Sequence, residues 1–254
     1  TDWDVSKDLG SGNVATDMMV HSQNTGTGGT TYLYVAIGDG AADYIWQYDG
    51  TNDTTTWTQH ASLQAICFAK SGKHVYRAHS TNLVSRVDNN SDIWTAANWG
   101  AANQFRIGHA TSAIRTMLVH PDGALYIFKS DGVYVLDEDG EDVQLYGAMK
   151  FAPNDDNGRH VWFGADGNSI HCTYGGMHYR ILPGGTLEPI GPERAVENNT
   201  DVRGYITAGV GHFVDYAAIY NPDSGESYLM KYGSWITEED GLAHVQDAWH
   251  GSIS

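Results

Sequence analysis

The sequence predicts an all-β protein, a β-propeller made of four-stranded antiparallel blades, and two observations lead to this class. The first is composition: the 254 residues include 30 glycines, 15 tyrosines and 8 tryptophans but only 6 prolines. Many glycines and aromatic residues are typical of short strands joined by tight turns. The second observation is an internal repeat of about 44 residues, a period typical of propeller blades.

The repeat begins with a short apolar run that is followed by a turn ending in glycine. These first strands are expected at residues 65–68, 116–119, 160–163 and 204–207, with an earlier copy at 15–21. The runs are apolar almost continuously rather than alternately. Both faces of each strand are therefore expected to be covered, as they are when blades pack face to face.

Three further strands complete each unit, separated by turn signals such as Ser130-Asp131-Gly132 and Gly184-Gly185. Second strands are expected at residues 32–37, 74–76, 125–128, 169–172 and 213–220. Third strands are expected at residues 44–48, 83–87, 133–136, 178–181 and 228–232. The fourth strand is less regular and is expected around Trp57, Trp94, 143–146 and 187–190.

The two ends of the chain resemble partial units. Asp2-Trp3-Asp4 resembles the tryptophan-bearing fourth strand, and residues 246–254 resemble a fresh first strand. We therefore predict a single β-propeller domain over residues 1–254, with five complete blades and partial terminal ones, that can be part of a longer chain. A β-sandwich is the alternative; it predicts similar strands but a less even recurrence.

The net charge limits the classes of partner that we expect, and the cysteine positions bear on disulfide formation. A formal net charge of −17 disfavours nucleic acid and anionic membranes, because binding to phosphates requires many Lys and Arg contacts. No apolar run approaches the length that spans a bilayer, so no membrane insertion is expected. Cys67 and Cys172 fall on non-equivalent strands of separate units, which predicts two buried thiols rather than a disulfide.

A basic position recurs with the repeat. Eight residues before the turn glycines Gly72, Gly123, Gly167 and Gly211 stand Gln64, Arg115, Arg159 and Arg203. In a propeller this position opens the inner strand near one rim of the central channel, where arginines could hold a carboxylate or phosphate. Alternatively, each arginine binds a loop carbonyl or a nearby carboxylate such as Asp156. His109, in the loop before the third unit, is the remaining candidate ligand-binding residue.

No catalytic residues, metal site or cofactor are predicted. The acidic segments 137–142 and 154–158 could bind calcium, but neither matches the known calcium loop, and solvated hairpin turns are the simpler interpretation. Aromatic residues near loops have two interpretations, as sugar-stacking platforms or as core. They include Trp46, Trp99, Tyr174 and Trp235.

One stretch resembles a known group of proteins. The run Gly123-Ala-Leu-Tyr-Ile-Phe-Lys-Ser-Asp-Gly-Val-Tyr-Val-Leu-Asp137, with Asn157-Gly158, Tyr179-Arg180 and Ile190-Gly191-Pro192-Glu193, resembles propeller proteins encoded by tailed bacteriophages and environmental viral genomes. The resemblance implies a virion-associated or tail-associated protein, located on the virion or outside the cell. Its implied partners are a protein or glycan of the host surface and other virion proteins.

Two functions of different class remain open at this point. The first is a non-enzymatic virion or surface propeller that binds a glycan or protein through its loops. The second is a carbohydrate-active hydrolase or lyase that uses paired carboxylates at the channel mouth. The sequence contains no recognisable catalytic set, which favours the first, since function depends on the site and not on the fold.

Overall fold

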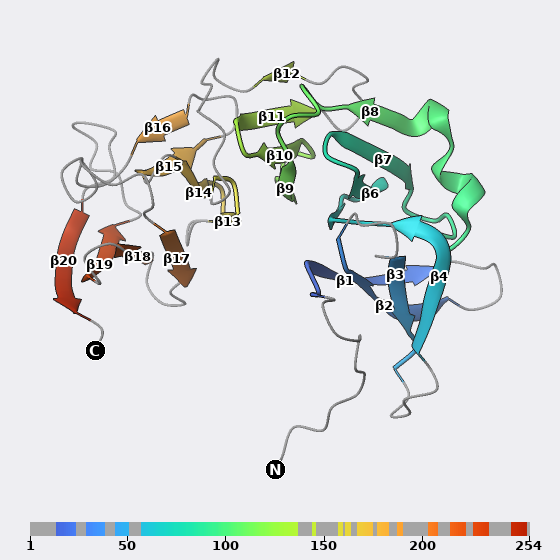
Figure 1. The fold of residues 1–254 in the computed structure, drawn as a ribbon, viewed down its shortest axis with the longest axis horizontal. Helices are drawn as coiled ribbons and strands as arrows, with labels where there is room; N and C mark the ends of the chain where they lie inside the picture. The colour runs from blue at the N-terminus through green and yellow to red at the C-terminus, as the bar shows by residue number, and fades with distance from the viewer. Residues whose placement is uncertain are drawn as a thin grey trace, which may run out of the picture. The chain divides into compact units, whose positions relative to one another are not determined.

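The computed structural model describes twenty β-strands and two short 3-10 helices (Figure 1). The described residues are 14–23, 29–38, 44–50, 57–136, 144–145, 157–159, 161–163, 167–174, 177–182, 187–189, 203–207, 214–221, 226–233 and 245–252. The described strands form five antiparallel sheets of four strands each, and within every sheet the strands are neighbours in chain order. This arrangement confirms the predicted all-β class and the four-stranded unit.

The first three sheets are formed by residues before 146. The first sheet contains β1 (Asp17–Gln23), β2 (Thr30–Ala36), β3 (Tyr44–Tyr48) and β4 (Trp57–Gln64). The second contains β5 (Cys67–Lys70), β6 (His74–His79), β7 (Leu83–Asp88) and β8 (Gln104–Arg106). The third contains β9 (Ile114–Val119), β10 (Leu125–Lys129), β11 (Gly132–Leu136) and β12 (Gln144–Leu145).

The last two sheets follow the same order. The fourth sheet contains β13 (Val161–Phe163), β14 (Ile170–Tyr174), β15 (Met177–Ile181) and β16 (Leu187–Pro189). The fifth contains β17 (Arg203–Thr207), β18 (Val214–Asn221), β19 (Glu226–Gly233) and β20 (Val245–Ser252). The predicted first, second and third strands of each unit overlap these elements, so the register read from the turn glycines is confirmed.

The prediction for the fourth strand of the second unit was wrong. Trp94 lies in a turn, because the Asp92 carboxylate accepts hydrogen bonds from the Trp94 amide at 2.8 Å and the Thr95 hydroxyl at 2.7 Å. These bonds hold the chain in a tight turn where a strand would need an extended backbone. Two 3-10 helices, η2 (Ala96–Trp99) and η3 (Ala101–Asn103), follow before the real fourth strand, β8.

The prediction for the C-terminal segment was also wrong. The segment expected at 246–254 does not begin a new unit over its described part, residues 246–252, because β20 pairs antiparallel with β19, with Tyr228 opposite His250 and Leu229 opposite Trp249. This pairing completes the fifth sheet as its fourth strand. Asp2-Trp3-Asp4, the other expected partial unit, lies outside the described residues.

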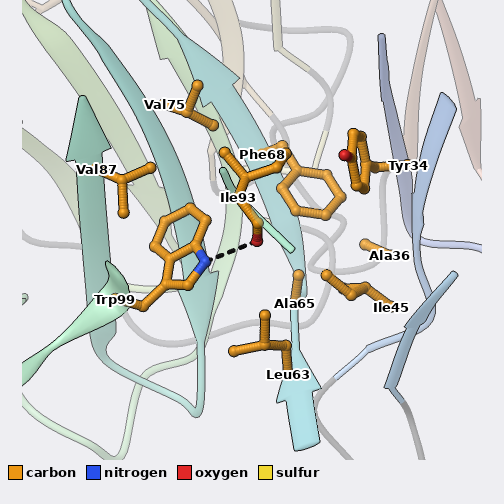
Figure 2. Close-up of a cluster of buried hydrophobic side chains, with 10 residues drawn as sticks. All are labelled: Tyr34, Ala36, Ile45, Leu63, Ala65, Phe68, Val75, Val87, Ile93 and Trp99. Carbon is orange, nitrogen blue, oxygen red and sulfur yellow. Dashed lines mark hydrogen bonds between the residues drawn. The ribbon is translucent and has the colours of Figure 1, made fainter. Parts of the chain in front are cut away.

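By contacts the chain divides into two compact units. The first contains Thr1–Val119, Gly123–Leu125 and Leu136–Val143; the second contains His120–Asp122, Tyr126–Val135 and Gln144–Ser254. In the first unit the second sheet packs against the first, and Figure 2 shows the shared core. Tyr34, Ala36 and Ile45 of the first sheet face Phe68, Val75 and Val87 of the second.

In the core of the second unit, Gly158 and Tyr174 lie in close contact. The Tyr174 hydroxyl lies 2.9 Å from the Lys129 carbonyl oxygen and 3.0 Å from that of Gly132, so its proton is shared between the two. Gly158, at a φ of +70°, passes directly over this contact. A Cβ atom added at Gly158 would lie 2.8 Å from the Tyr174 hydroxyl, which explains why this position is glycine.

The two cysteines are buried free thiols, as predicted, on β5 and β14. Burial raises the pKa of both thiols, because the thiolate is poorly solvated in the core. In the part of the chain that the structure describes, no helix has the length and apolar character needed to span a bilayer.

Candidate functional site

A group of buried polar side chains in the first unit, including Arg77, Asn82 and Ser85, lies where β5 and β9 begin, beside the β6–β7 turn. We call this region the strand-start end. At its centre Arg77 of β6 is only 5% exposed, and its Nη1 donates to the Gln64 carbonyl at 2.9 Å. Its guanidinium carbon lies 4.8 Å from the centre of the Trp99 ring, which adds a cation–π contact. Arg77 thus ties the outgoing end of the first sheet to the second sheet.

Arg77 has no carboxylate partner among the described residues, so its charge is offset only by a carbonyl dipole and an aromatic face. Burial lowers the pKa of Arg77 to about 10, which still leaves the guanidinium charged at neutral pH. A buried cation produces a positive potential around it. At the same end of the sheets the Asp17 carboxylate accepts a hydrogen bond from the Phe68 amide at 2.7 Å, so the strand-start end contains both a buried cation and a carboxylate.

Nearby histidines respond to this environment. His79, the last residue of β6, contacts the Ser85 hydroxyl at 2.7 Å. Burial, and next the charge of Arg77, lower the pKa of His79 to about 4. The same two causes help to lower the pKa of His60 on β4, with burial as the larger. Both rings are therefore neutral at pH 7, and neither adds charge to the site.

The β6–β7 turn fixes the loop that leads into β9. Asn82 Nδ2 donates to the Gly108 carbonyl at 3.1 Å, and the Ile107 amide donates to the Asn82 carbonyl at 2.8 Å. The Ile114 amide donates to Thr81 at 3.0 Å, which sets the start of β9. These bonds hold the exposed His109 and the half-buried Arg115 at the strand-start end.

The predicted site residues occupy different local structures. Gln64 is the last residue of β4, Arg115 is the second residue of β9, and Arg203 is the first residue of β17. Arg159 is exposed in the turn before β13. Asp156 and the side chain of Arg203 lie outside what the structure describes. The structure connects Gln64 with Arg77 and places His109 near the start of β9; a convergence of the three predicted arginines stays a prediction.

Arg77 is the residue that the sequence reasoning missed. It performs the carbonyl-binding role that was the alternative interpretation for the other arginines. Its signal was an arginine within the apolar run Val75-Tyr76-Arg77-Ala78, where a polar residue needs a partner once the strand is covered. Nothing in that run names the partner, because Gln64 comes from the preceding unit.

Two of the four candidate stacking aromatics are core residues. Trp99 and Tyr174 are buried, and Trp99 Nε1 donates to the Ile93 carbonyl at 2.9 Å (Figure 2). Neither ring face is open to a sugar. Trp46 on β3 is half-buried, and Trp235 lies outside the described residues.

Most of the acidic segments proposed for calcium also lie outside the described residues. Asn157, at the end of the second segment, is buried, and its Nδ2 donates to the Ser130 carbonyl at 2.9 Å. Among the residues that the structure does describe, no group of histidine, cysteine and acidic side chains could hold a metal ion.

The five four-stranded antiparallel sheets define the class of the protein as a β-propeller, and solved structures agree. No family model matches the sequence, and no curated protein matches it. The extracellular domain of BT4673, a candidate hybrid two-component system of B. thetaiotaomicron, is similar over 95% of this chain, with 15% identity and a TM-score of 0.58. This chain covers 29% of that one.

Two further structures match over most of this chain. A candidate 6-phosphogluconolactonase of Bacteroides uniformis ATCC 8492 matches over 93% of this chain and 83% of its own, with 14% identity and a TM-score of 0.51. A chain of the mitotic checkpoint complex matches over 90% and 65%, with 12% identity and a TM-score of 0.52. At these identities the likeness establishes the fold and leaves function open.

Proposed function

We propose that this chain is a non-enzymatic binding propeller that recognises a carboxylate-bearing surface partner, a glycan or a protein, at the strand-start ends of its sheets. The observation that supports this most is Arg77, a buried cation without a described carboxylate partner in an otherwise strongly acidic chain. A buried cation attracts anionic groups on a partner and repels cationic ones.

In this proposal the buried and exposed arginines have different roles. Arg77 is buried, and its Nη1 donates to the Gln64 carbonyl. It therefore contributes positive charge near the site and does not contact the partner. Arg115, the second residue of β9, and the exposed Arg159, in the turn before β13, each supply contacts of their own. A guanidinium group matches a carboxylate through two parallel hydrogen bonds, which gives geometric specificity as well as attraction.

The setting of this function rests on the sequence resemblance alone. The segment Gly123–Asp137 and the motifs that follow it resemble propellers of tailed phages and environmental viral genomes. We therefore propose a virion or extracellular location, with a structural role beside other virion proteins. The structural comparisons support only the propeller fold.

A glycan array and a panel of acidic peptides test the proposal. We expect retention of carboxylate-bearing ligands, with Arg115→Gln and Arg159→Gln each weakening binding about tenfold, equivalent to about 1.4 kcal/mol. The matched control is Lys73→Gln, which removes an exposed cation from the β5–β6 turn, at the opposite end of the second sheet, and should leave binding unchanged. Equal binding by Arg159→Gln and wild type would contradict the proposal. Release of cleaved sugar from a retained glycan would instead favour a hydrolase or lyase.

A further inference from the structure

The strand β4 contains a bulge at residues 60–63. The described pairing of β4 with β3 shifts register there and gives these residues no partner across β3. Amides in a bulge lack ladder partners and need another acceptor. His60 provides it, because its Nδ1 accepts hydrogen bonds from the Ser62 amide at 2.9 Å and from the Leu63 amide at 2.8 Å.

The other ring nitrogen of His60 connects β4 to the turn that follows β7. Since Nδ1 accepts from two amides, it carries no proton, and the neutral ring has its hydrogen on Nε2. Nε2 therefore donates to the Trp94 carbonyl, at 2.9 Å. The ring also meets the Trp94 indole edge to face, with ring centres 4.7 Å apart. One neutral histidine thus joins the bulge of the first sheet to the Asp92–Thr95 turn of the second.

We infer that His60 is a pH-sensitive latch between the first and second sheets. The latch is closed while the ring is neutral and opens when the ring takes up a proton. A proton on Nδ1 would point at the Ser62 and Leu63 amides, so these donors lose their acceptor and three N–H groups face one another. The charged ring cannot keep this arrangement, and the bulge must separate from it.

Two charged groups act on the His60 ring from elements packed against it. The Arg77 guanidinium of β6 opposes a second positive charge, and the Asp92 carboxylate favours one. Burial is the largest influence, and the pKa of His60 is lowered. The strands β3 and β4 add only side chains that are uncharged at neutral pH. Folding therefore favours the neutral ring, and the latch weakens as the pH falls below about 6.5, the pKa of an exposed histidine.

Two further titratable groups connect to the ring through Trp94. Tyr34 contacts the Trp94 ring, with ring centres 6.2 Å apart, and His21 contacts Tyr34. Burial raises the pKa of Tyr34, which stays neutral, while burial and next the charge of Lys70 on β5 lower the pKa of His21. His21 therefore also gains charge in acid, and a variant is needed to separate it from His60.

Both sides of the latch lead to the contacts of Arg77. The strand β4 ends at Gln64, whose carbonyl accepts from Arg77. The segment after Trp94 contains Trp99, whose ring packs on the same guanidinium. Opening of the latch therefore loosens both contacts, and acid acts through His60 on the strand-start end.

Hydrogen exchange of the Leu63 amide, followed by NMR, tests the latch. We expect the protection factor, which is corrected for the intrinsic pH dependence of exchange, to fall severalfold from pH 7 to pH 5; one proton allows at most about tenfold per pH unit. His60→Asn is the matched variant, because its Oδ1 accepts from nearby amides but does not titrate. Its Leu63 protection should be equal at both pH values. His21→Gln removes the other titrating ring and should keep the wild-type fall.

Nitrogen NMR of the His60 ring in the wild-type chain gives a readout that needs no variant. At pH 7 the proton is expected on Nε2, and the ring should become doubly protonated in step with the loss of Leu63 protection. A neutral ring with its proton on Nδ1, or Leu63 protection that stays constant from pH 7 to pH 5, overturns the inference. An equal fall in His60→Asn, or loss of the fall in His21→Gln, would assign the opening to another group and overturn it as well.

Discussion

At the residue scale, Gly158 has a left-handed backbone conformation, with a φ of +70°, and no space for a side chain. A Cβ atom there would lie 2.8 Å from the Tyr174 hydroxyl, 3.1 Å from the Lys129 carbonyl oxygen and 3.2 Å from Phe128 Cβ. We predict that Gly158→Ala lowers the free energy of unfolding by about 2–4 kcal/mol, from left-handed strain and overpacking together. The control is Gly167→Ala, which has a similar φ of +68° but nothing within 4 Å.

Urea denaturation of the two variants separates the two causes. Gly167→Ala should lose only the conformational part, about 1–2 kcal/mol. Equal losses in both variants would mean that the contact of Gly158 with Tyr174 and Lys129 is not tightly packed.

Arg77 allows a second prediction at this scale, because burial of its charge and its packing can be separated. Arg77→Met keeps most of the volume beside Trp99 while removing the buried cation, so stability should change by less than about 1 kcal/mol. Arg77→Ala should be less stable than Arg77→Met by roughly 2–4 kcal/mol, because it leaves a cavity. Removing the cation should also raise the pKa of His79, which proton NMR of its ring can follow; an unchanged His79 titration would contradict the assigned electrostatics.

At the scale of the element, Asp92 ends the expected strand and joins two sheets. It accepts hydrogen bonds from Gln23 Nε2 at 2.7 Å, from the Trp94 amide at 2.8 Å and from the Thr95 hydroxyl at 2.7 Å. Asp92→Ala should lower the free energy of unfolding by about 2–3 kcal/mol, because the partly buried bonds from Gln23 and Trp94 lose their acceptor. Asp88→Ala removes an exposed carboxylate from the same sheet and should stay within about 0.5 kcal/mol of wild type. A similar loss of unfolding free energy in both variants would show that the Asp92 hydrogen bonds contribute no more to stability than an exposed carboxylate does.

The elements also show which parts of the fold were predictable. Apolar runs and turn glycines are local signals, so strands such as β6, β10 and β11 could be placed from the sequence. The turn at Trp94 could not be placed from the sequence, because hydrogen bonds to the Asp92 carboxylate bend the chain where the aromatic pattern indicates a strand. β20 was misassigned because the sequence of a strand does not show which other strand it pairs with. In the structure β20 pairs with β19 and completes the fifth sheet.

The candidate site was less predictable than the strands. The spacing before each turn glycine identified Gln64 and Arg115, but it could not show that the Gln64 side chain matters less than its carbonyl. Arg77 was missed because its importance depends on burial between two sheets, a long-range property. Sequence spacing identifies equivalent positions; packing decides which of them are left to bind a partner.

At the scale of the whole molecule, buried histidines make stability depend on pH. Burial lowers the pKa of His21, His60 and His79, the last to about 4, below the value of about 6.5 for an unfolded chain. The unfolded state therefore binds more protons between these values, and stability falls as the pH drops from about 6.5 toward about 4. Asp17, whose pKa is raised by burial, partly opposes this at the acid end.

The pH prediction is checked by urea midpoints at pH 8 and pH 5. Wild type should be less stable at pH 5, and His79→Gln should show a smaller difference between the two pH values, because one of the three titrating rings is gone. A wild-type midpoint that does not fall at pH 5 would contradict the burial of these rings.

Net charge gives the last prediction, because the chain and its proposed carboxylate-bearing partner are both acidic. The Debye length falls from about 10 Å at 0.1 M salt to about 3 Å at 1 M, so added salt screens attraction and repulsion between exposed charges. Binding of a carboxylate to Arg115 or Arg159 depends on attraction at the arginine, and raising the salt concentration from about 0.1 M to about 1 M should weaken it severalfold. Arg159→Gln should show a smaller dependence on salt, because one of the attracting charges is gone. Binding that strengthens steadily with salt would mean that repulsion by the whole acidic chain outweighs the arginines, and would contradict the proposed contacts.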